Sequence, residues 1–257
     1  MRVMVETVRG ALAVQRRVKF GLWLVRLRLR LRARGCRLIV DAPHGAVVQG
    51  KPGIRVFPPG DGTATMTLRF GKGVWIEDGF TLDVDPRGDS LLEIGDDALI
   101  MRNVRIILQG GTISLGPRCN LRDGVWLKSS GRLTLGSDIP IAQNSAIHCS
   151  AEIRFADHVG LAERVTVLDS DHGFDGSATH FLNRPLQVEP TTVDRNTFIA
   201  AGAVVLRGSR IGANSFVGAN SVVRGGDYGD GSLIAGVPAK IIGRGAETDA
   251  AIAAARS

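Results

Sequence analysis

The sequence predicts an all-β protein in which short parallel strands stack as coils, with a short helix before the stack and one loop interrupting it. Three observations predict this fold. Aliphatic residues recur every six positions over most of the chain, and glycine is abundant (33 of 257 residues) while aromatic residues make up only 5%. The repeat then breaks between Val165 and Glu189, where Asp, His, Phe and Asn replace the aliphatic residues.

The first expected element is a basic amphipathic helix within residues 1–35. Residues 1–34 carry ten Arg or Lys against the single acid Glu6, a charge of +9, whereas the rest of the chain carries −2. Phe20, Trp23, Leu27 and Leu31 fall on one helical stripe, and Gly35 suits a C-cap. We expect a helix over about 7–34.

Three roles remain open for this helix. It could pack on the coils or on a neighbouring subunit, or it could dock on an anionic membrane surface. Nucleic-acid binding is the weakest of the three, because the chain has few aromatic residues and no recognisable nucleic-acid-binding fold.

Residues 36–243 are expected to form the coils. Five consecutive hexads over 193–222 open with Val or Ile: VDRNTF, IAAGAV, VLRGSR, IGANSF and VGANSV. The frame also holds over 94–111, over 141–152 and, after a shift of two residues at Ile153-Arg154, over 155–166. A helix of 3.6 residues per turn would scatter these positions over its surface. Short strands with Gly or Asn at corners of positive φ keep them inward, whereas a β-sandwich would show longer strands of period two.

Cysteine usage and the absence of a leader favour a cytoplasmic protein. Cys36, Cys119 and Cys149 lie far apart and show no metal-binding spacing, which is typical of free thiols in a reducing compartment. The apolar stretch over 20–29 is interrupted by arginines and is not typical of a signal peptide. We therefore expect a cytoplasmic chain, or one peripheral at the inner face of the membrane, without a bound metal.

The stretch IAAGAVVLRGSRIGANSFVGANSVVRGG, followed by SLIAGVPAKIIG (199–243), resembles the hexapeptide-repeat acyltransferases. The AGVPAK closure is similar to that of the sugar O-acetyltransferase branch, which includes maltose, galactoside and polysaccharide O-acetyltransferases. The resemblance covers about residues 90–243. It implies a left-handed parallel β-helix, a homotrimer with active sites between neighbouring β-helices, and acetyl-CoA-dependent transfer of an acetyl group to a saccharide hydroxyl in surface polysaccharide or glycolipid biosynthesis.

The interruption, about 169–192, must leave the stack as a loop, since the strands on either side still pair. In the resembled family this loop lies beside the active site and carries the catalytic histidine, which corresponds to His172. A neutral imidazole can take the proton of an attacking hydroxyl near neutral pH. A carboxylate could orient the ring, and the sequence leaves Asp169, Asp171, Asp175 and Glu189 as candidates.

The resemblance also implies the contacts to the acyl donor. The backbone N–H of Ala201, where the family has Ser, would stabilise the developing oxyanion. Ala219 would lie beside the pantetheine arm, and Lys240 near the nucleotide phosphates. Arg224 and Gly225 stand where the family often has Thr-Lys, so Arg224 is the replacement cation.

The acceptor side departs from the family. Arg164, in ERV, replaces the Asn of the PNV found in maltose and galactoside enzymes, which favours an anionic saccharide acceptor. The remaining acceptor contacts are expected from the loop, at Asp175, His180 and Asn183.

Other functions are weaker. N-acetylation of a nucleotide-linked amino sugar remains an alternative, although no nucleotide-binding βαβ unit is evident in residues 1–60, and an inactive scaffold is another. A metal-dependent carbonic anhydrase of this fold would need an HxxxxH pair, which the four histidines from His148 to His180 do not form. Residues 244–257 are expected to be a frayed helix or disordered.

Overall fold

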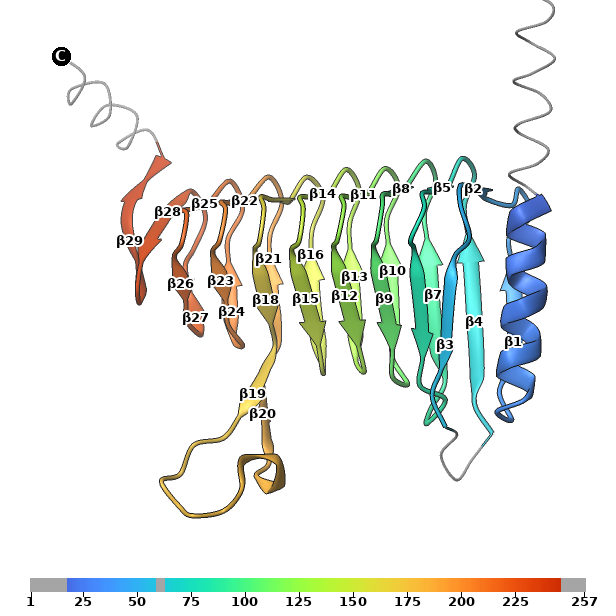
Figure 1. Cartoon of the computed structure of the whole chain (residues 1–257). Coiled ribbons are helices and arrows are strands. Elements are labelled where there is room, and N and C mark those ends of the chain that lie inside the picture. The colour runs from blue at the N-terminus through green and yellow to red at the C-terminus, as the bar shows by residue number, and fades with distance from the viewer. Residues whose placement is uncertain (1–17, 59–62, 246–257) are drawn as a thin grey trace, which may run out of the picture.

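A computed structural model describes residues 18–58 and 63–245. The predicted fold is confirmed: short strands of successive coils pair in parallel along the whole stack, and one hairpin protrudes from it (Figure 1). The architecture is consistent with the left-handed parallel β-helix that the resemblance implies. Within the described part of the chain, no helix is long and apolar enough to cross a membrane.

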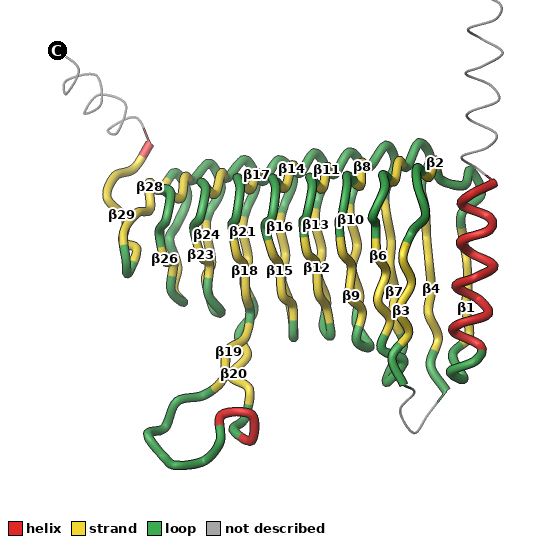
Figure 2. The backbone as a smooth tube through the Cα atoms, in the orientation of Figure 1, coloured by secondary structure: helices red, strands yellow, loops and turns green. Residues whose placement is uncertain are grey.

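Each complete coil contributes one strand to each of three faces, which we name A, B and C (Figure 2). Face A consists of β1 (Arg37–Asp41), β4 (Thr65–Phe70), β7 (Ser90–Ile94), β10 (Thr112–Leu115), β13 (Arg132–Leu135), β16 (Glu152–Phe155), β21 (Thr191–Val193), β24 (Ser209–Ile211) and β27 (Gly226–Asp227). Face B consists of β2 (Val47–Val48), β5 (Trp75–Ile76), β8 (Leu99–Ile100), β11 (Asn120–Leu121), β14 (Pro140–Ile141), β17 (Gly160–Leu161), β22 (Phe198–Ile199), β25 (Phe216–Val217), β28 (Ser232–Gly236) and β29 (Ala239–Arg244). Face C consists of β3 (Gly53–Val56), β6 (Thr81–Val84), β9 (Arg105–Leu108), β12 (Trp126–Ser129), β15 (Ala146–Cys149), β18 (Thr166–Leu168), β23 (Val204–Val205) and β26 (Val222–Val223).

The coils shorten from the N-terminal end to the C-terminal end. Stacked residues are 28 apart between Arg37 and Thr65, 20 apart between Thr112 and Arg132, and 18 apart between Thr192 and Arg210. Only the last of these values equals three hexads, so the six-residue frame describes the C-terminal coils best. In the longer coils the strands of faces A and C have four or more residues and point two side chains inward, as Ile153 and Phe155 do in β16.

The hexad-opening residues form the core. Val193, Ile199, Val205, Ile211, Val217 and Val223 are each at most 2% exposed. They stack as three pairs, one on each face: Val193 with Ile211, Ile199 with Val217, and Val205 with Val223. Each coil therefore buries the apolar side chains of the next. The free thiols of Cys119 and Cys149 are buried in the same core.

The corners use left-handed backbone conformations, as expected. Asn103, Asn144, Asn196, Asn214 and Asn220 all have φ between 54° and 60°. Asn tolerates this region better than most residues because its short polar side chain bonds locally. Arg164 occupies the same kind of corner with φ 56°, although arginine gains nothing from that conformation.

Both ends of the stack are covered. The described part of the N-terminal helix, residues 18–32, lies across the first coil, and its expected start in residues 7–17 falls outside the described residues (Figure 1). At the other end β29 folds back antiparallel on β28. These covers shield strand edges that would otherwise invite pairing with another chain.

The interruption leaves the stack after β18 and re-enters at β21. It forms a two-stranded antiparallel hairpin, β19 (Ser170–His172) with β20 (Leu186–Val188), and a short 3-10 helix η1 (Phe181–Asn183) near its tip. The expected tail continues beyond residue 245, outside the described residues.

Candidate functional site

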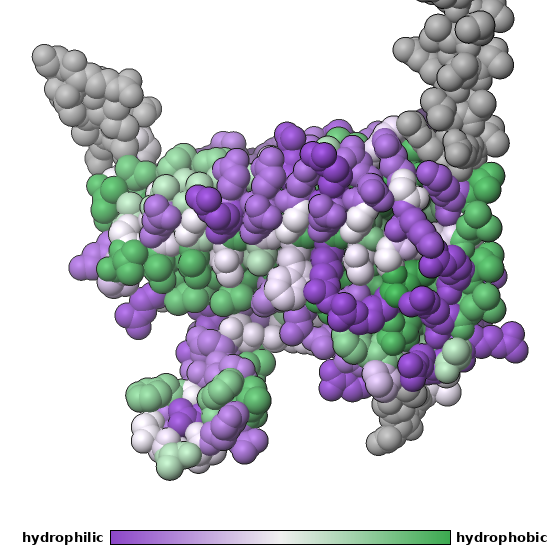
Figure 3. Space-filling view, viewed as in Figure 1, coloured by the Kyte–Doolittle hydropathy of each residue, from purple (hydrophilic) through white to green (hydrophobic). Residues whose placement is uncertain are grey.

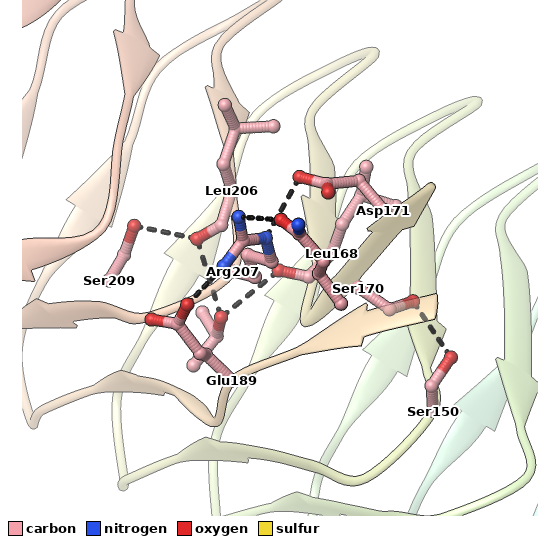
Figure 4. Close-up of polar contacts among 10 residues, drawn as sticks. Ser150, Leu168, Ser170, Asp171, Glu189, Leu206, Arg207 and Ser209 are labelled. Carbon is pink, nitrogen blue, oxygen red and sulfur yellow. Dashed lines mark hydrogen bonds and ion pairs between the residues drawn. The ribbon is translucent and has the colours of Figure 1, made fainter. Parts of the chain in front are cut away.

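The base of the protruding hairpin is closed by the coils around it (Figure 4). The Glu189 N–H donates to the Asp169 carbonyl (2.9 Å), and the Thr191 hydroxyl donates to the Leu168 carbonyl (3.0 Å). The Ser150 and Ser170 hydroxyls are 2.8 Å apart. The hairpin therefore starts from a fixed point on the stack.

Asp169 contributes to this fixed point. Its side chain is fully buried, and its two carboxylate oxygens accept the N–H groups of Ser150 and Ala151, each at 2.7 Å. Both oxygens are thus used on the preceding coil. These bonds hold the base of the loop, and neither of them joins Asp169 to His172.

Arg207, one coil later, clamps both strands of the hairpin. Its Nε lies 3.0 Å from Asp171 Oδ2, and its Nη2 donates to Gln187 Oε1 at 2.6 Å. Its Nη1 also pairs with Glu189. One guanidinium therefore ties β19, β20 and the return segment to the coil, using the fork geometry specific to arginine.

His172 points from the hairpin into an aromatic group. Its ring meets the Phe181 ring edge-on with centroids 5.4 Å apart, and the His180 ring stacks on Phe181 with centroids 4.8 Å apart. Asn183 ends the same 3-10 helix, η1. The structure thus brings together His172 and His180, two of the residues predicted for the site, at Phe181, and places Asn183 two residues further along η1.

The rest of the loop is organised by Arg184, whose side chain is 13% exposed. Its guanidinium donates to the carbonyls of Thr179 and Ser177, at 3.0 and 2.8 Å, and of Gly173 at 3.3 Å, and lies 3.4 Å from Asp175. The Ser177 N–H also donates to Asp175, which lowers the pKa of that carboxyl below its usual range. Asp175 therefore shapes the loop as well as being exposed at its surface.

None of the four candidate carboxylates contacts His172 in the described part of the chain. Asp169 bonds the preceding coil, Asp171 and Glu189 bind Arg207, and Asp175 faces Arg184. Asp171 and His172 are consecutive on β19, so their side chains point to opposite faces of the hairpin. Within the described part of one chain, therefore, none of these four carboxylates orients His172.

A second group of predicted residues lies at the corner between faces B and C, which we call the BC corner. The Asn220 N–H donates to the Ala201 carbonyl (2.9 Å), so Ala201 and Ala219 sit on consecutive coils of one row. Arg164 lies one coil earlier, where the Gly202 N–H bonds Glu163 beside it. Within the described residues the N–H groups of Ala201 and Ala219 have no acceptor.

The side chains of this row become smaller on the coils where the acyl donor is expected. On consecutive coils the row presents the long side chains of Gln143 and Glu163, and then the methyl side chains of Ala201 and Ala219 on the last two coils. The Gly236 N–H donates to Ser221 Oγ at 3.2 Å, so the turn between β28 and β29 continues the row. Lys240, exposed and opposite Ala235, lies at its C-terminal end. The residues present thus fit a thin chain with free N–H donors beside it and a cation at one end.

Arg224 does not belong to this row. It lies between β26 and β27, at the corner between faces C and A, which we call the CA corner. It lines a cleft of 470 Å³ at the base of the hairpin together with Asp171, Glu189, Leu206, Arg207 and Gly225. The structure therefore separates Arg224 from the other residues predicted to hold the donor, and places it beside the loop instead.

The two groups face different sides of one chain. His172 leaves the stack at the CA corner, whereas Ala201 lies at the BC corner, and the extended segment from Ala201 to Arg207 spans up to about 20 Å. Their heights nevertheless agree, because the loop precedes β21 and Ala201 follows β22 in the same coil. A single chain therefore carries the two groups of predicted site residues at one level of the stack, on different corners.

Sequence reasoning missed Arg207, Arg184 and Phe181. Arg207 is the third residue of an otherwise regular hexad, and only the stacking of that hexad under Glu189 reveals its partners. Phe181 had a usable signal, since it is an aromatic residue in the loop of a chain that is only 5% aromatic. Among the described residues no group of three His, Cys, Asp or Glu could hold a metal ion.

Comparison with known proteins agrees with this architecture. Residues 190–225 match the model for the bacterial transferase hexapeptide, six repeats. A probable acetyltransferase of Mycobacterium tuberculosis is 28% identical over 114 residues. This segment spans 44% of the chain and only 37% of that relative.

Solved structures are similar in fold. A serine-to-alanine variant of AntD, an N-acyltransferase from Bacillus cereus, in complex with dTDP-4-amino-4,6-dideoxyglucose and coenzyme A, superposes with a TM-score of 0.51 at 20% identity, over 63% of this chain and 88% of AntD. The polySia-specific acetyltransferase NeuO gives a TM-score of 0.48 at 18% identity, over 80% and 86% of the two chains. The predicted resemblance to the hexapeptide-repeat acyltransferases is thus confirmed.

Proposed function

Because the chain carries the hexapeptide repeat of bacterial transferases, we propose that it is an acetyl-CoA-dependent O-acetyltransferase acting on a saccharide hydroxyl. The observation that carries this proposal is the shared height of the two half-sites. The coil that follows the His172 loop is the one whose corner offers the free Ala201 N–H. A base and an oxyanion donor are the two groups that acyl transfer to an alcohol requires.

In the proposed reaction acetyl-CoA supplies the acetyl group as a thioester. His172 accepts the proton of the acceptor hydroxyl while the hydroxyl oxygen attacks the thioester carbon. The Ala201 N–H donates a hydrogen bond to the oxygen that becomes negative. The C–S bond then breaks, and the imidazolium returns its proton to the sulfur, so protons and charge balance.

The assembly follows from the separation of the half-sites. Since His172 and Ala201 lie at different corners of one chain, a second copy packed at the same height would bring its BC corner to this loop. We propose the homotrimer implied by the resemblance, with each site between two subunits. The carboxylate or carbonyl that orients His172 would then come from the adjoining subunit.

The acceptor is proposed to be an anionic saccharide, consistent with a role in surface polysaccharide or glycolipid assembly. Arg164 adds a cation to the BC corner one coil before Ala201. His180 stacks on Phe181 and Asn183 ends the same 3-10 helix, and both residues are polar and exposed. These groups would select the acceptor rather than take part in proton transfer.

An assay of thiol release from acetyl-CoA, with neutral, acidic and nucleotide-linked amino sugars as acceptors, tests the proposal. We expect His172→Asn to lower turnover by about 10²–10⁴-fold. His158→Asn is the matched control, because His158 is an exposed corner residue with φ 61° that Asn can adopt. Full activity of His172→Asn would remove the proposed base.

The chemical stability of the product separates the two transferase alternatives. An O-acetyl ester is released by mild hydroxylamine, whereas an N-acetyl amide is not. A variant of the N-acyltransferase AntD was crystallised in complex with an amino sugar nucleotide, but AntD resembles this chain in fold alone. An amide product on the amino sugar, with no ester on any saccharide, would establish N-acetylation instead.

A further inference from the structure

The N-terminal helix has two apolar sides. One side packs on the coils through Phe20, Trp23, Leu27 and Leu31, which are at most 5% exposed. Packing on the coils is the first of the three roles expected for the helix. It does not account for the opposite side of the helix.

The opposite side carries a second row, Val18, Leu22, Val25 and Leu29, which we call the outer stripe. Its members are 54%, 59%, 54% and 64% exposed. Their spacing of four, three and four residues aligns them along one side of the helix. Figure 3 shows this side of the helix as an apolar strip at the end of the molecule. Four large aliphatic side chains in one exposed line are unusual for a surface that meets only water.

The helix cannot roll to hide the outer stripe. The Phe20 ring meets Phe70 edge-on at 5.3 Å, and the Trp23 ring meets Phe80 at 6.1 Å. Turning the outer stripe inward would expose all four buried side chains, Trp23 among them. The helix is therefore held with the outer stripe facing away from the coils.

Cations border the outer stripe on both sides. At 100° per residue, Lys19, Arg26 and Arg30 fall along one side of the stripe and Arg28 and Arg32 along the other. Within the part of the chain that the structure describes, none of these five forms an ion pair, and Arg30 donates only to the Ile54 carbonyl (2.6 Å). The positive charges thus lie free beside the apolar row.

We propose that the outer stripe and its flanking cations dock the protein on an anionic lipid surface. The aliphatic side chains would enter the boundary between headgroups and acyl chains, and the arginines would bind the lipid phosphates. The surface charge argues for lipid over a second copy of the chain. Two such helices packed stripe to stripe would face each other with five cations each. Four side chains are also few for an interface that needs about 800 Å² from each partner.

Vesicle sedimentation with the full-length protein tests this proposal. We expect binding to phosphatidylcholine vesicles containing about 30% phosphatidylglycerol at about 0.1 M salt, and much weaker binding to pure phosphatidylcholine. Leu22→Gln with Leu29→Gln should weaken binding at least about 10-fold, through loss of the apolar contact. Arg28→Gln with Arg32→Gln should weaken it about 30-fold, at about fivefold for each of the two charges.

The matched control is Arg132→Gln with Arg154→Gln, which removes the same charge from exposed positions on face A. It should bind vesicles as the wild type does. Unchanged circular dichroism and melting temperature show that the stripe variant is folded, since its altered side chains are exposed.

Equal binding to both vesicle types, or undiminished binding by the stripe variant, would overturn the proposal. A fall in molecular mass of the stripe variant in sedimentation velocity, with no vesicle binding by the wild type, would assign the outer stripe to a second copy. None of these readouts depends on acetyl transfer, so the proposal stands or fails separately from the proposed function.

Discussion

Arg207 Nε and Asp171 Oδ2 lie 3.0 Å apart, and this contact joins the seventh coil of the stack to the first strand of the protruding hairpin. The same guanidinium reaches Gln187 and Glu189 on the returning side. The loop that presents His172 is thus oriented by a residue that belongs to the regular repeat. Its position on the rigid stack explains how a loop of about 20 residues can present a side chain in one direction.

Arg207→Met should loosen the hairpin without unfolding the coils. The Arg207 side chain is 25% exposed, so its solvent-screened ion pairs contribute about 1 kcal/mol. We expect chymotryptic cleavage in the loop, at Phe174 or Phe181, to be about five times faster, with the melting temperature of the stack little changed. Arg210→Met is the control, because Arg210 is exposed on β24 and forms no ion pair among the described residues. Equal cleavage rates in both variants would show that Arg207 does not restrain the loop.

Arg164→Asn should separate stability from acceptor binding. The left-handed corner with φ 56° suits Asn, so this change is expected to stabilise the fold by about 0.5–1 kcal/mol in denaturant unfolding. Arg164→Ala removes the same charge without that gain. Both variants should lose affinity for an anionic saccharide, measured as an increased KM for the acceptor. Unchanged acceptor affinity in Arg164→Ala would argue against an anionic acceptor.

The core thiols should be unreactive in the folded protein. Burial raises the pKa of Cys119 from 9.0 to about 11 and that of Cys149 to about 12. These shifts lower the thiolate fraction at a given pH about 100-fold for Cys119 and about 1000-fold for Cys149. We expect iodoacetamide at pH 8 to modify them only after denaturation, as followed by mass spectrometry. Rapid labelling of either residue in the native protein would contradict its burial.

The same pKa shifts set an alkaline limit on stability. Since the folded-state values exceed those of the unfolded thiols, the protonated form is favoured by folding, and its contribution is complete below about pH 9. It is lost as the pH rises through 11 and 12. Denaturant midpoints should therefore fall between pH 9 and 12, and less steeply in a Cys119→Val Cys149→Val variant.

One strand offers a direct measure of core packing. Ile113 is fully buried in β10, whereas its neighbour Thr112 points outward and is only partly covered. Ile113→Ala should lower the free energy of unfolding by about 2–5 kcal/mol. Thr112→Ala, on the same strand, should change it by less than about 0.5 kcal/mol. Similar losses of unfolding free energy in both variants would mean that Thr112, on the outer side of face A, is covered in solution.

Much of the fold could be predicted because the repeat is local. A hexad such as IGANSF contains its own strand, its own corner and the residue that turns it, and Asn214 has the expected positive φ. The taper of the coils could not be predicted from a fixed period of six. A strand of four residues, such as Glu152–Phe155, points both Ile153 and Phe155 inward, which appears in the sequence only as a shifted frame.

The site was less predictable than the fold, because its contacts join residues far apart in sequence. The break in the repeat located the loop and His172. The roles of the neighbouring acids depended on partners that no local pattern reveals. Asp169 is held by the backbone of residues 150–151, and Asp171 by Arg207, 36 residues away. Ala201 and Arg224 lie at different corners because Ala201 follows a strand of face B and Arg224 follows a strand of face C. The hexads show where strands begin, but not to which face each strand belongs.

Because the stack is covered at both ends, the number of coils fixes the distance between the N-terminal helix and the His172 loop. The helix with the outer stripe lies below the first coil, and the His172 loop leaves after the sixth, so at about 4.8 Å per coil they are separated by about 30 Å. Each complete coil between them is an interchangeable spacer. Deleting the coil 112–131, whose neighbours would re-pair in the same register, would shorten the distance by one coil thickness and leave both ends intact. The distance of the loop from the proposed lipid surface would then depend on the number of coils between the helix and the loop.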